Sequence, residues 1–184
     1  PGLAADGGPL PEPSYGGQLN QAAILRVPAE GRAVAIYEEL QGTYADGEPY
    51  SLRQPTYAFV DLAFGPLPED LQVSPRTAPF MIGLGLLESV SQADILARAD
   101  PDDADGDGFS GRPNMVWDGR RQATALGRFG WKANVPSLEQ QNSGAFNGDI
   151  GITSPLFPLQ NCTPVQAACL VAPSGGEPEA DQLK

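Results

Sequence analysis

Glycine and proline interrupt this chain so often that long regular elements do not fit between them. The sequence contains 22 glycines and 19 prolines in 184 residues, spread along its length, and both residue types weaken the interiors of helices and strands. The hydrophobic fraction, 41%, is nevertheless that of a globular protein. We therefore expect an α+β fold of short helices, one or two β-hairpins and long irregular loops.

Turn residues between β-prone runs predict two hairpins. Residues 32–65 alternate and are rich in Val, Ile, Tyr and Thr, with a turn at 45–49. Pro55 lies in the second run and would confine it to a sheet edge or interrupt it, because proline has no amide hydrogen to donate. A smaller hairpin is predicted within 113–133, with Asp118-Gly119 as its turn.

Helices are predicted where capping residues precede apolar segments. Ser91 is a good N-cap for a short helix over 92–99, and Ser137 for a helix that ends near Gly151. Another helical segment is expected within 74–90, and a short one over 18–26, stopped by Pro28. The predicted organisation is an extended lead-in over 1–16, one central domain over 17–172 and a polar tail over 173–184.

Charge and missing residue types exclude several functions. The net charge of −12 repels the phosphates of nucleic acids, so no nucleic-acid partner is expected. The chain has no histidine, which removes the commonest general base, zinc ligand and haem ligand. The longest apolar run, over 79–90, is too short to cross a bilayer, so no membrane span is expected.

Two cysteines lie near the end of the chain, Cys162 and Cys169. A zinc site is disfavoured because two thiolates lack further ligands, and the spacing is not that of a redox CxxC motif. A disulfide that closes this short loop is the favoured interpretation. It predicts an oxidising compartment and therefore a periplasmic or secreted protein.

The acidic segment 100–114 raises the question of a metal site. Its aspartates alternate and are followed by a glycine, as in the first half of many calcium-binding loops, and carboxylate oxygens suit calcium. The predicted ligands are the side chains of Asp103, Asp105 and Asp107, the carbonyl oxygen of Phe109, and Asn114. An asparagine in the last position predicts weaker binding than a full EF-hand site. The alternative is a solvated surface loop that binds no metal.

Several stretches together resemble the bacterial di-haem oxidoreductase family. They are "SPRTAPFMIGLGLLESV", "ADPDDADGDGFSGRPNMVWD", "LGRFGWKA", "SLEQQ" with "AFNGDIGIT", and the final C-x6-C pair. Members are secreted or periplasmic c-type cytochromes, described as peroxidases or thiol oxidoreductases. The resemblance covers residues 15–169 and implies the central region of a cytochrome c peroxidase-like fold.

This chain departs from the family in one respect. Family members attach two haems through CxxCH motifs, one on each side of this region, and neither motif occurs here. The resemblance therefore implies a haem-less central segment, inactive alone, whose partners are the haem-bearing flanking regions of a parent protein. Haem c would be present only in that parent, and the redox partner is not indicated.

A further similarity, to the di-haem cytochrome c peroxidases, implies roles for individual residues. It implies that Trp131 bridges electron transfer, that Gln140 or Gln141 orients peroxide or water, and that Asp149 transfers a proton. Arg128 would bind a haem propionate. The plainer alternatives are a core anchor for Trp131, a helix-end or turn residue for Asp149, and an ordinary ion pair for Arg128.

Two other interpretations remain open. The chain could be a secreted, calcium-stabilised binding module that has kept the scaffold and lost catalysis. It could also be an unrelated acidic globular domain, for which the order of the five motifs would be a coincidence.

Overall fold

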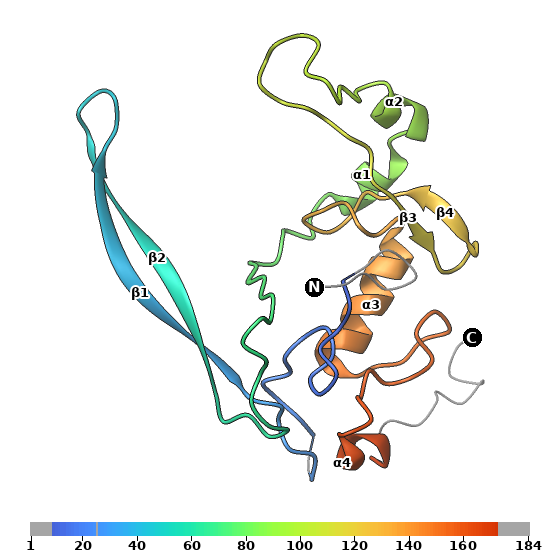
Figure 1. The fold of residues 1–184 in the computed structure, drawn as a ribbon. Helices are drawn as coiled ribbons and strands as arrows, with labels where there is room; N and C mark the ends of the chain where they lie inside the picture. Colours follow the sequence, from blue (N-terminus) through green and yellow to red (C-terminus); the bar gives the residue numbers. More distant parts are fainter. Residues whose placement is uncertain (1–8, 25, 173–184) are drawn as a thin grey trace. The chain divides into compact units, whose positions relative to one another are not determined.

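The computed structural model describes residues 9–24 and 26–172, which form two compact units (Figure 1). The hairpin unit comprises residues 11–69 and 162–172, and the helical unit comprises mainly residues 70–161. The predicted division into lead-in, single domain and tail stays a prediction, and its ends, 1–8 and 173–184, lie outside the described residues.

A long antiparallel ribbon dominates the hairpin unit. Strands β1 (Arg32–Thr43) and β2 (Pro49–Val60) pair along their whole length, from Arg32↔Val60 to Thr43↔Pro49. The turn is closed by a hydrogen bond from the Tyr44 amide to the Glu48 carbonyl, 2.8 Å, and Gly47 has φ 93°. Glycine suits this left-handed position because it has no Cβ. The hairpin predicted over 32–65 is confirmed.

Tyr15 is the buried aromatic residue at the base of this unit, 4% exposed. Its hydroxyl donates to the Gly65 carbonyl, 2.5 Å, and accepts from the Phe64 amide, 3.0 Å. Its ring meets that of Phe64 edge to face, with centroids 5.9 Å apart. A buried phenol needs such partners, and here they attach the N-terminal segment to the chain that leaves β2.

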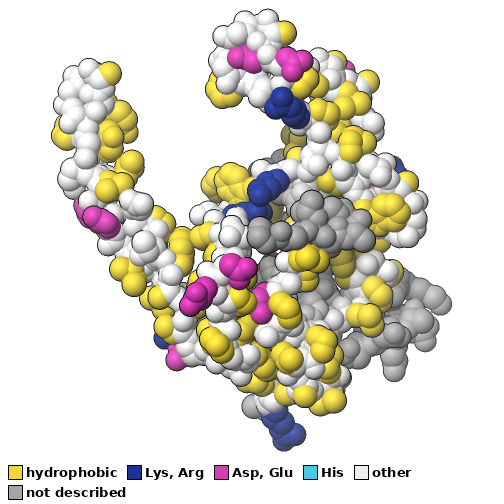
Figure 2. All heavy atoms as spheres, in the orientation of Figure 1, with side chains coloured by type: hydrophobic (Ala, Val, Ile, Leu, Met, Phe, Trp, Pro, Cys, Tyr) yellow, Lys and Arg dark blue, Asp and Glu magenta, His cyan; other side chains and the backbone are white. Residues whose placement is uncertain are grey.

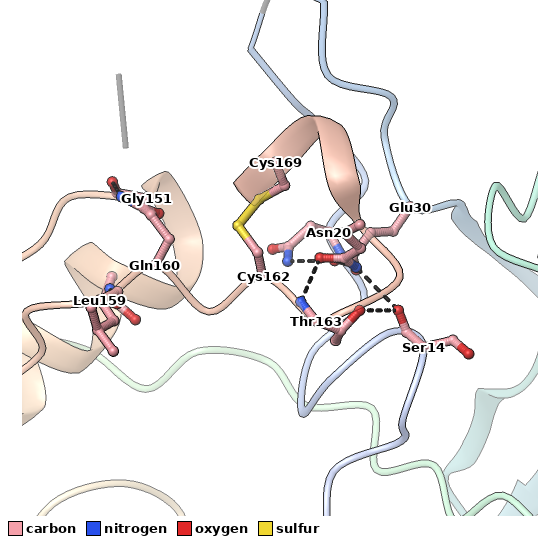
Figure 3. The surroundings of a disulfide bond; sticks show 11 residues. Ser14, Asn20, Glu30, Gly151, Leu159, Gln160, Cys162, Thr163 and Cys169 are labelled. Atoms are coloured by element: carbon pink, nitrogen blue, oxygen red, sulfur yellow. Dashed lines mark hydrogen bonds between the residues drawn. A yellow bond between two sulfur atoms is a disulfide. The ribbon is translucent and has the colours of Figure 1, made fainter. Parts of the chain in front are cut away.

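The end of the chain is attached to the same base through the segment around α4 (Ala167–Leu170). The predicted disulfide between Cys162 and Cys169 is present, with Cα atoms 5.9 Å apart. Within this loop the Thr163 hydroxyl donates to the Ser14 carbonyl, 2.8 Å (Figure 3). The Gln166 amide donates to the carboxylate of Glu30, 2.7 Å. The loop therefore holds two earlier segments of the chain.

The helical unit consists of short elements. They are α1 (Leu84–Ser89), α2 (Gln92–Leu96), β3 (Met115–Asp118), β4 (Ala123–Leu126) and α3 (Leu138–Ile150). Strands β3 and β4 form the predicted second hairpin, with Met115 opposite Leu126. The hydroxyls of Ser91 and Ser137 accept from the amides of Asp94 and Gln140, so both predicted N-caps are confirmed.

Leu126 and Phe129 form the buried apolar centre of this unit, 3% and 2% exposed. Around them, Arg128 donates to the carbonyls of Leu87 and Val90 at the end of α1, at 3.1 and 2.5 Å. The Glu88 carboxylate accepts from the Leu138 amide, 2.9 Å, at the start of α3. These contacts join α1 to α3.

Short helices, two hairpins and long loops make the fold α+β, as predicted.

Two predicted helices differ from the structure. The segment 74–90 is helical only in α1, and the described residues of 18–26 form no helix. In the second case the Asn20 amide donates to the Glu30 carboxylate, 2.7 Å, and the Gln21 side chain accepts from the Ala33 amide, 3.2 Å. Tertiary hydrogen bonds therefore replace helical ones. Among the helices of the described residues, none has the length and apolar character to cross a membrane.

Candidate functional site

The acidic loop of the helical unit is closed at its base by backbone contacts. The Asp100 amide donates to the Gly111 carbonyl, 2.9 Å, and the Arg112 guanidinium donates to the Pro101 carbonyl. Between these ends the backbone turns back through left-handed residues, with φ 51° at Asp103 and 73° at Gly106. A closed loop of this kind brings its side chains together.

Three aspartates of this loop form a group of converging carboxylates. One oxygen from each of Asp100, Asp103 and Asp105 lies within 4.8 Å of the other two. Two oxygens that bind one calcium ion at about 2.3–2.6 Å lie at most about 5.2 Å apart, so this spacing fits shared coordination. Without a cation, each pair repels by about 1 kcal/mol in water.

The same carboxylates also organise the loop. Both oxygens of Asp103 accept from the Gly108 amide, each at 3.2 Å, and both oxygens of Asp100 accept from the Ala104 amide. Asp105 accepts from the Asp107 amide, 3.2 Å. Such local bonds are typical of aspartates in turns, with or without a metal.

Of the five predicted metal ligands, only Asp103 and Asp105 belong to this group. Asp107 accepts from the Phe109 amide, 2.8 Å, and the Phe109 side chain is 77% exposed. The Asn114 side chain donates to the carbonyls of Lys132 and Ala133, 3.0 and 3.2 Å. Sequence reasoning missed Asp100, although its place just before the alternating aspartates was a usable signal.

Trp131 lies in the turn that follows the buried Phe129. Its indole nitrogen donates to the Thr77 carbonyl, 2.6 Å, and the residue is 61% exposed. It therefore attaches the irregular segment before α1 without being a core residue. Gly130, beside it, has φ 79°, and a Cβ there would lie 2.6 Å from the Asn134 side chain.

The predicted glutamines on α3 have different surroundings. Gln140 accepts from the Gly119 amide, 2.9 Å, and donates to the Trp117 carbonyl, 3.1 Å, so both ends of its carboxamide hold the β3–β4 hairpin. The Gln141 side-chain oxygen lies beside Gly130, 3.9 Å from where a Cβ would stand. Gln141 is thus the glutamine nearer the turn of Trp131.

Asp149 is an exposed residue in the last turn of α3. It lies eight positions after Gln141, which places the two about 12 Å apart along the helix axis. Side chains at this distance do not meet at one small reactant. The structure therefore brings Gln141 close to the Trp131 turn but does not bring Asp149 to the same point.

Arg128 borders a small polar cavity of about 220 Å³. Two other arginines and three acidic residues line it, and they pair with one another: Arg120 with Glu139 at 2.6 Å and Arg121 with Asp118 at 3.7 Å. Asp118 is buried and also accepts from two amides of its own turn. The charges around the cavity are balanced, and Arg128 is engaged with the carbonyls of α1.

A family model described as "Di-haem oxidoreductase, putative peroxidase" matches residues 4–172, nearly the whole chain. Searches of curated proteins and of solved structures gave no match.

Proposed function

Because the chain belongs to the di-haem oxidoreductase family, we propose that it is the haem-less central segment of a periplasmic or secreted oxidoreductase with peroxidase-like electron transfer. The haems would be carried by flanking regions of a parent protein, and the segment alone would be inactive. One contrast carries this proposal. The family model matches residues 4–172, but the sequence has no histidine and no CxxCH motif with which to hold a haem.

The residues of this chain do not fit covalent haem c. Thioether attachment needs two free cysteines in a CxxCH motif, and the motif's histidine ligates the iron. The two cysteines here are seven positions apart and joined in a disulfide, and the sequence has no histidine. The chain's part in the reaction would therefore be to bridge electron transfer through Trp131 and to orient peroxide or water through Gln141.

Exposed apolar side chains support the presence of a covering region. Phe80, Met81 and Ile82 are consecutive and 89%, 71% and 94% exposed. Figure 2 shows hydrophobic side chains spread over the visible face. A soluble protein that stands alone rarely leaves such a run in water. Flanking regions of a parent protein would remove it from solvent.

Calcium at the acidic loop is the second part of the proposal. The spacing of Asp100, Asp103 and Asp105 supports it, since a divalent cation would offset the repulsion among three close carboxylates. The disulfide supports an oxidising compartment, and calcium sites in extracellular modules are typically weak ones.

The reading frame of the parent gene tests the proposal directly. CxxCH motifs on both sides of this segment are expected, and the purified parent should contain two haems by pyridine haemochrome assay and oxidise an electron donor with peroxide. The 184-residue chain alone should show no Soret absorbance and no such activity. A reading frame without the two motifs would instead favour the second candidate, a calcium-stabilised binding module that has lost catalysis.

A further inference from the structure

The β1–β2 ribbon is a large feature that the proposed function does not use. Each strand has 12 residues, and among the described residues the sheet they form has two strands. The part of the ribbon away from the Arg32–Val60 end is exposed, including Ile36 at 58%, Leu40 at 43% and Leu52 at 57%. An isolated two-stranded sheet is at best marginally stable in water, and further strands make such a sheet stable.

The hydrogen-bond pattern shows which backbone groups of the ribbon face outward. Tyr44 and Glu48 form a hydrogen-bonded pair at the turn. Because such pairs alternate with non-hydrogen-bonded ones, the odd-numbered residues of β1 point their amide and carbonyl groups away from β2. The Ala33 amide agrees with this assignment, since it donates to the Gln21 side chain outside the ribbon.

The two free edges of the ribbon differ. Pro49 and Pro55 stand opposite Thr43 and Tyr37 in non-hydrogen-bonded pairs, so both prolines lack an amide hydrogen at outward positions of β2. Prolines placed in this way block an edge against another strand. The outward positions of β1 from Ala35 to Thr43 contain no proline, and within the described residues their amides make no hydrogen bond outside the ribbon.

We infer that the β1 edge pairs antiparallel with the β1 edge of a second copy of this chain, giving a four-stranded sheet in the order β2–β1–β1–β2. A two-fold axis lets each edge supply the donors that the other accepts. The proline-blocked β2 edges then lie on the outside and close the assembly at two copies. A second copy supplies a proline-free edge of the same length, so it can pair along β1.

The charges of β1 restrict the register. A two-fold axis at Glu38 or Glu39 would place each glutamate opposite its own copy, which is unfavourable. A two-fold axis at Leu40 places Leu40 opposite Leu40 of the second copy, and Glu39 opposite its Gln41. In this register the outward amides and carbonyls of one β1 strand face those of the other. In this register the exposed Leu40 side chains, each beside Leu52 of its own ribbon, form one apolar strip across the new sheet.

A pair of matched proline substitutions tests the inference on the 184-residue chain. Gln41 and Ser51 are cross-strand partners, both with outward amides, and their side chains hydrogen-bond to each other at 2.9 Å. Gln41→Pro therefore blocks the β1 edge, whereas Ser51→Pro alters only the edge that prolines already block. Sedimentation velocity over about 1 μM to 1 mM at about 0.15 M salt should show a monomer–dimer equilibrium in the unsubstituted chain.

Gln41→Pro should raise the dimer dissociation constant at least about tenfold, and Ser51→Pro should change it by less than about twofold. Hydrogen exchange of the unsubstituted chain gives a second readout, which needs no variant to fold. Protection of the β1 amides should rise with protein concentration, and protection of the β2 amides should not. A chain that stays monomeric, equal effects of the two prolines, or exchange independent of concentration would each overturn the inference.

Discussion

Asp100 and Asp107 carry the same charge and lie in the same loop, yet they have different neighbours. Asp100 converges with Asp103 and Asp105, whereas Asp107 accepts from the Phe109 amide outside that group. We predict that calcium raises the melting temperature of the chain, that Asp100→Asn removes most of this rise, and that Asp107→Asn keeps it. A ligand at a hundredfold its dissociation constant adds about 2.7 kcal/mol of stability, which a thermal melt resolves.

The two substitutions are matched because each removes one negative charge from the loop. Melts in calcium and in chelator, at equal ionic strength, separate binding from general screening of the −12 charge. The reverse result, with the rise lost only in Asp107→Asn, would favour the ligands predicted from sequence. Superimposed melts of the unsubstituted chain would exclude a calcium site.

Residue types in the chain predicted local features well and tertiary partners poorly. Gln140 shows the difference: its place on a helix capped by Ser137 follows from the sequence, because a cap acts within one turn. Its bonds to Gly119 and Trp117 do not follow, because they join segments about twenty positions apart. The contact between Trp131 and Thr77 was hidden for the same reason.

At the scale of elements, the hairpins were predictable because their turns are marked by Asp, Gly and Pro within a few residues. The helix predicted over 18–26, which the described residues of that range do not form, shows the limit. The prediction rested on a short segment stopped by Pro28, but Glu30 and Ala33 offer partners to Asn20 and Gln21, and no local signal marks such partners. Asp100 entered the acidic group in the same way, through its bridge to Gly111.

Removal of the disulfide between Cys162 and Cys169 should have an effect that stays within the hairpin unit. Chain entropy alone gives a disulfide across so short a loop about 2–3 kcal/mol. The loop also carries Thr163 and Gln166, which hold Ser14 and the buried Glu30. We predict that Cys162→Ser with Cys169→Ser lowers the free energy of unfolding of the hairpin unit by about 2–3 kcal/mol and speeds hydrogen exchange in residues 11–30.

Residues 138–150 provide the internal control for that experiment, because α3 belongs to the helical unit and makes its own backbone hydrogen bonds. Exchange there should not change. Two thiols that titrate in the unreduced, denatured chain would show that the disulfide does not form in solution. An unchanged exchange rate in 11–30 would show that the loop does not hold the N-terminal segment.

At the scale of the whole molecule, the chain has little buried apolar surface for its length. Among the described residues, the buried hydrophobic side chains are those of Tyr15, Leu126 and Phe129. Several buried positions are polar instead, including Glu30, Asp118 and Gln166, and each has hydrogen-bond partners. Hydrophobic burial is the main favourable term in folding, so the proposed flanking regions, or a second copy, would add stability by covering the exposed side chains.

Ile82 offers a test of that covering, because it is 94% exposed. In the isolated chain Ile82→Ser should change the free energy of unfolding by less than about 0.5 kcal/mol, as for other exposed positions. Leu126→Ser, at a buried position, should cost at least about 2 kcal/mol and serves as the control. In the parent protein, where flanking regions would cover this segment, the Ile82 substitution should also become destabilising by about 1–3 kcal/mol. Denaturant unfolding of both proteins measures the difference, and a neutral effect in both would mean that nothing covers Ile82.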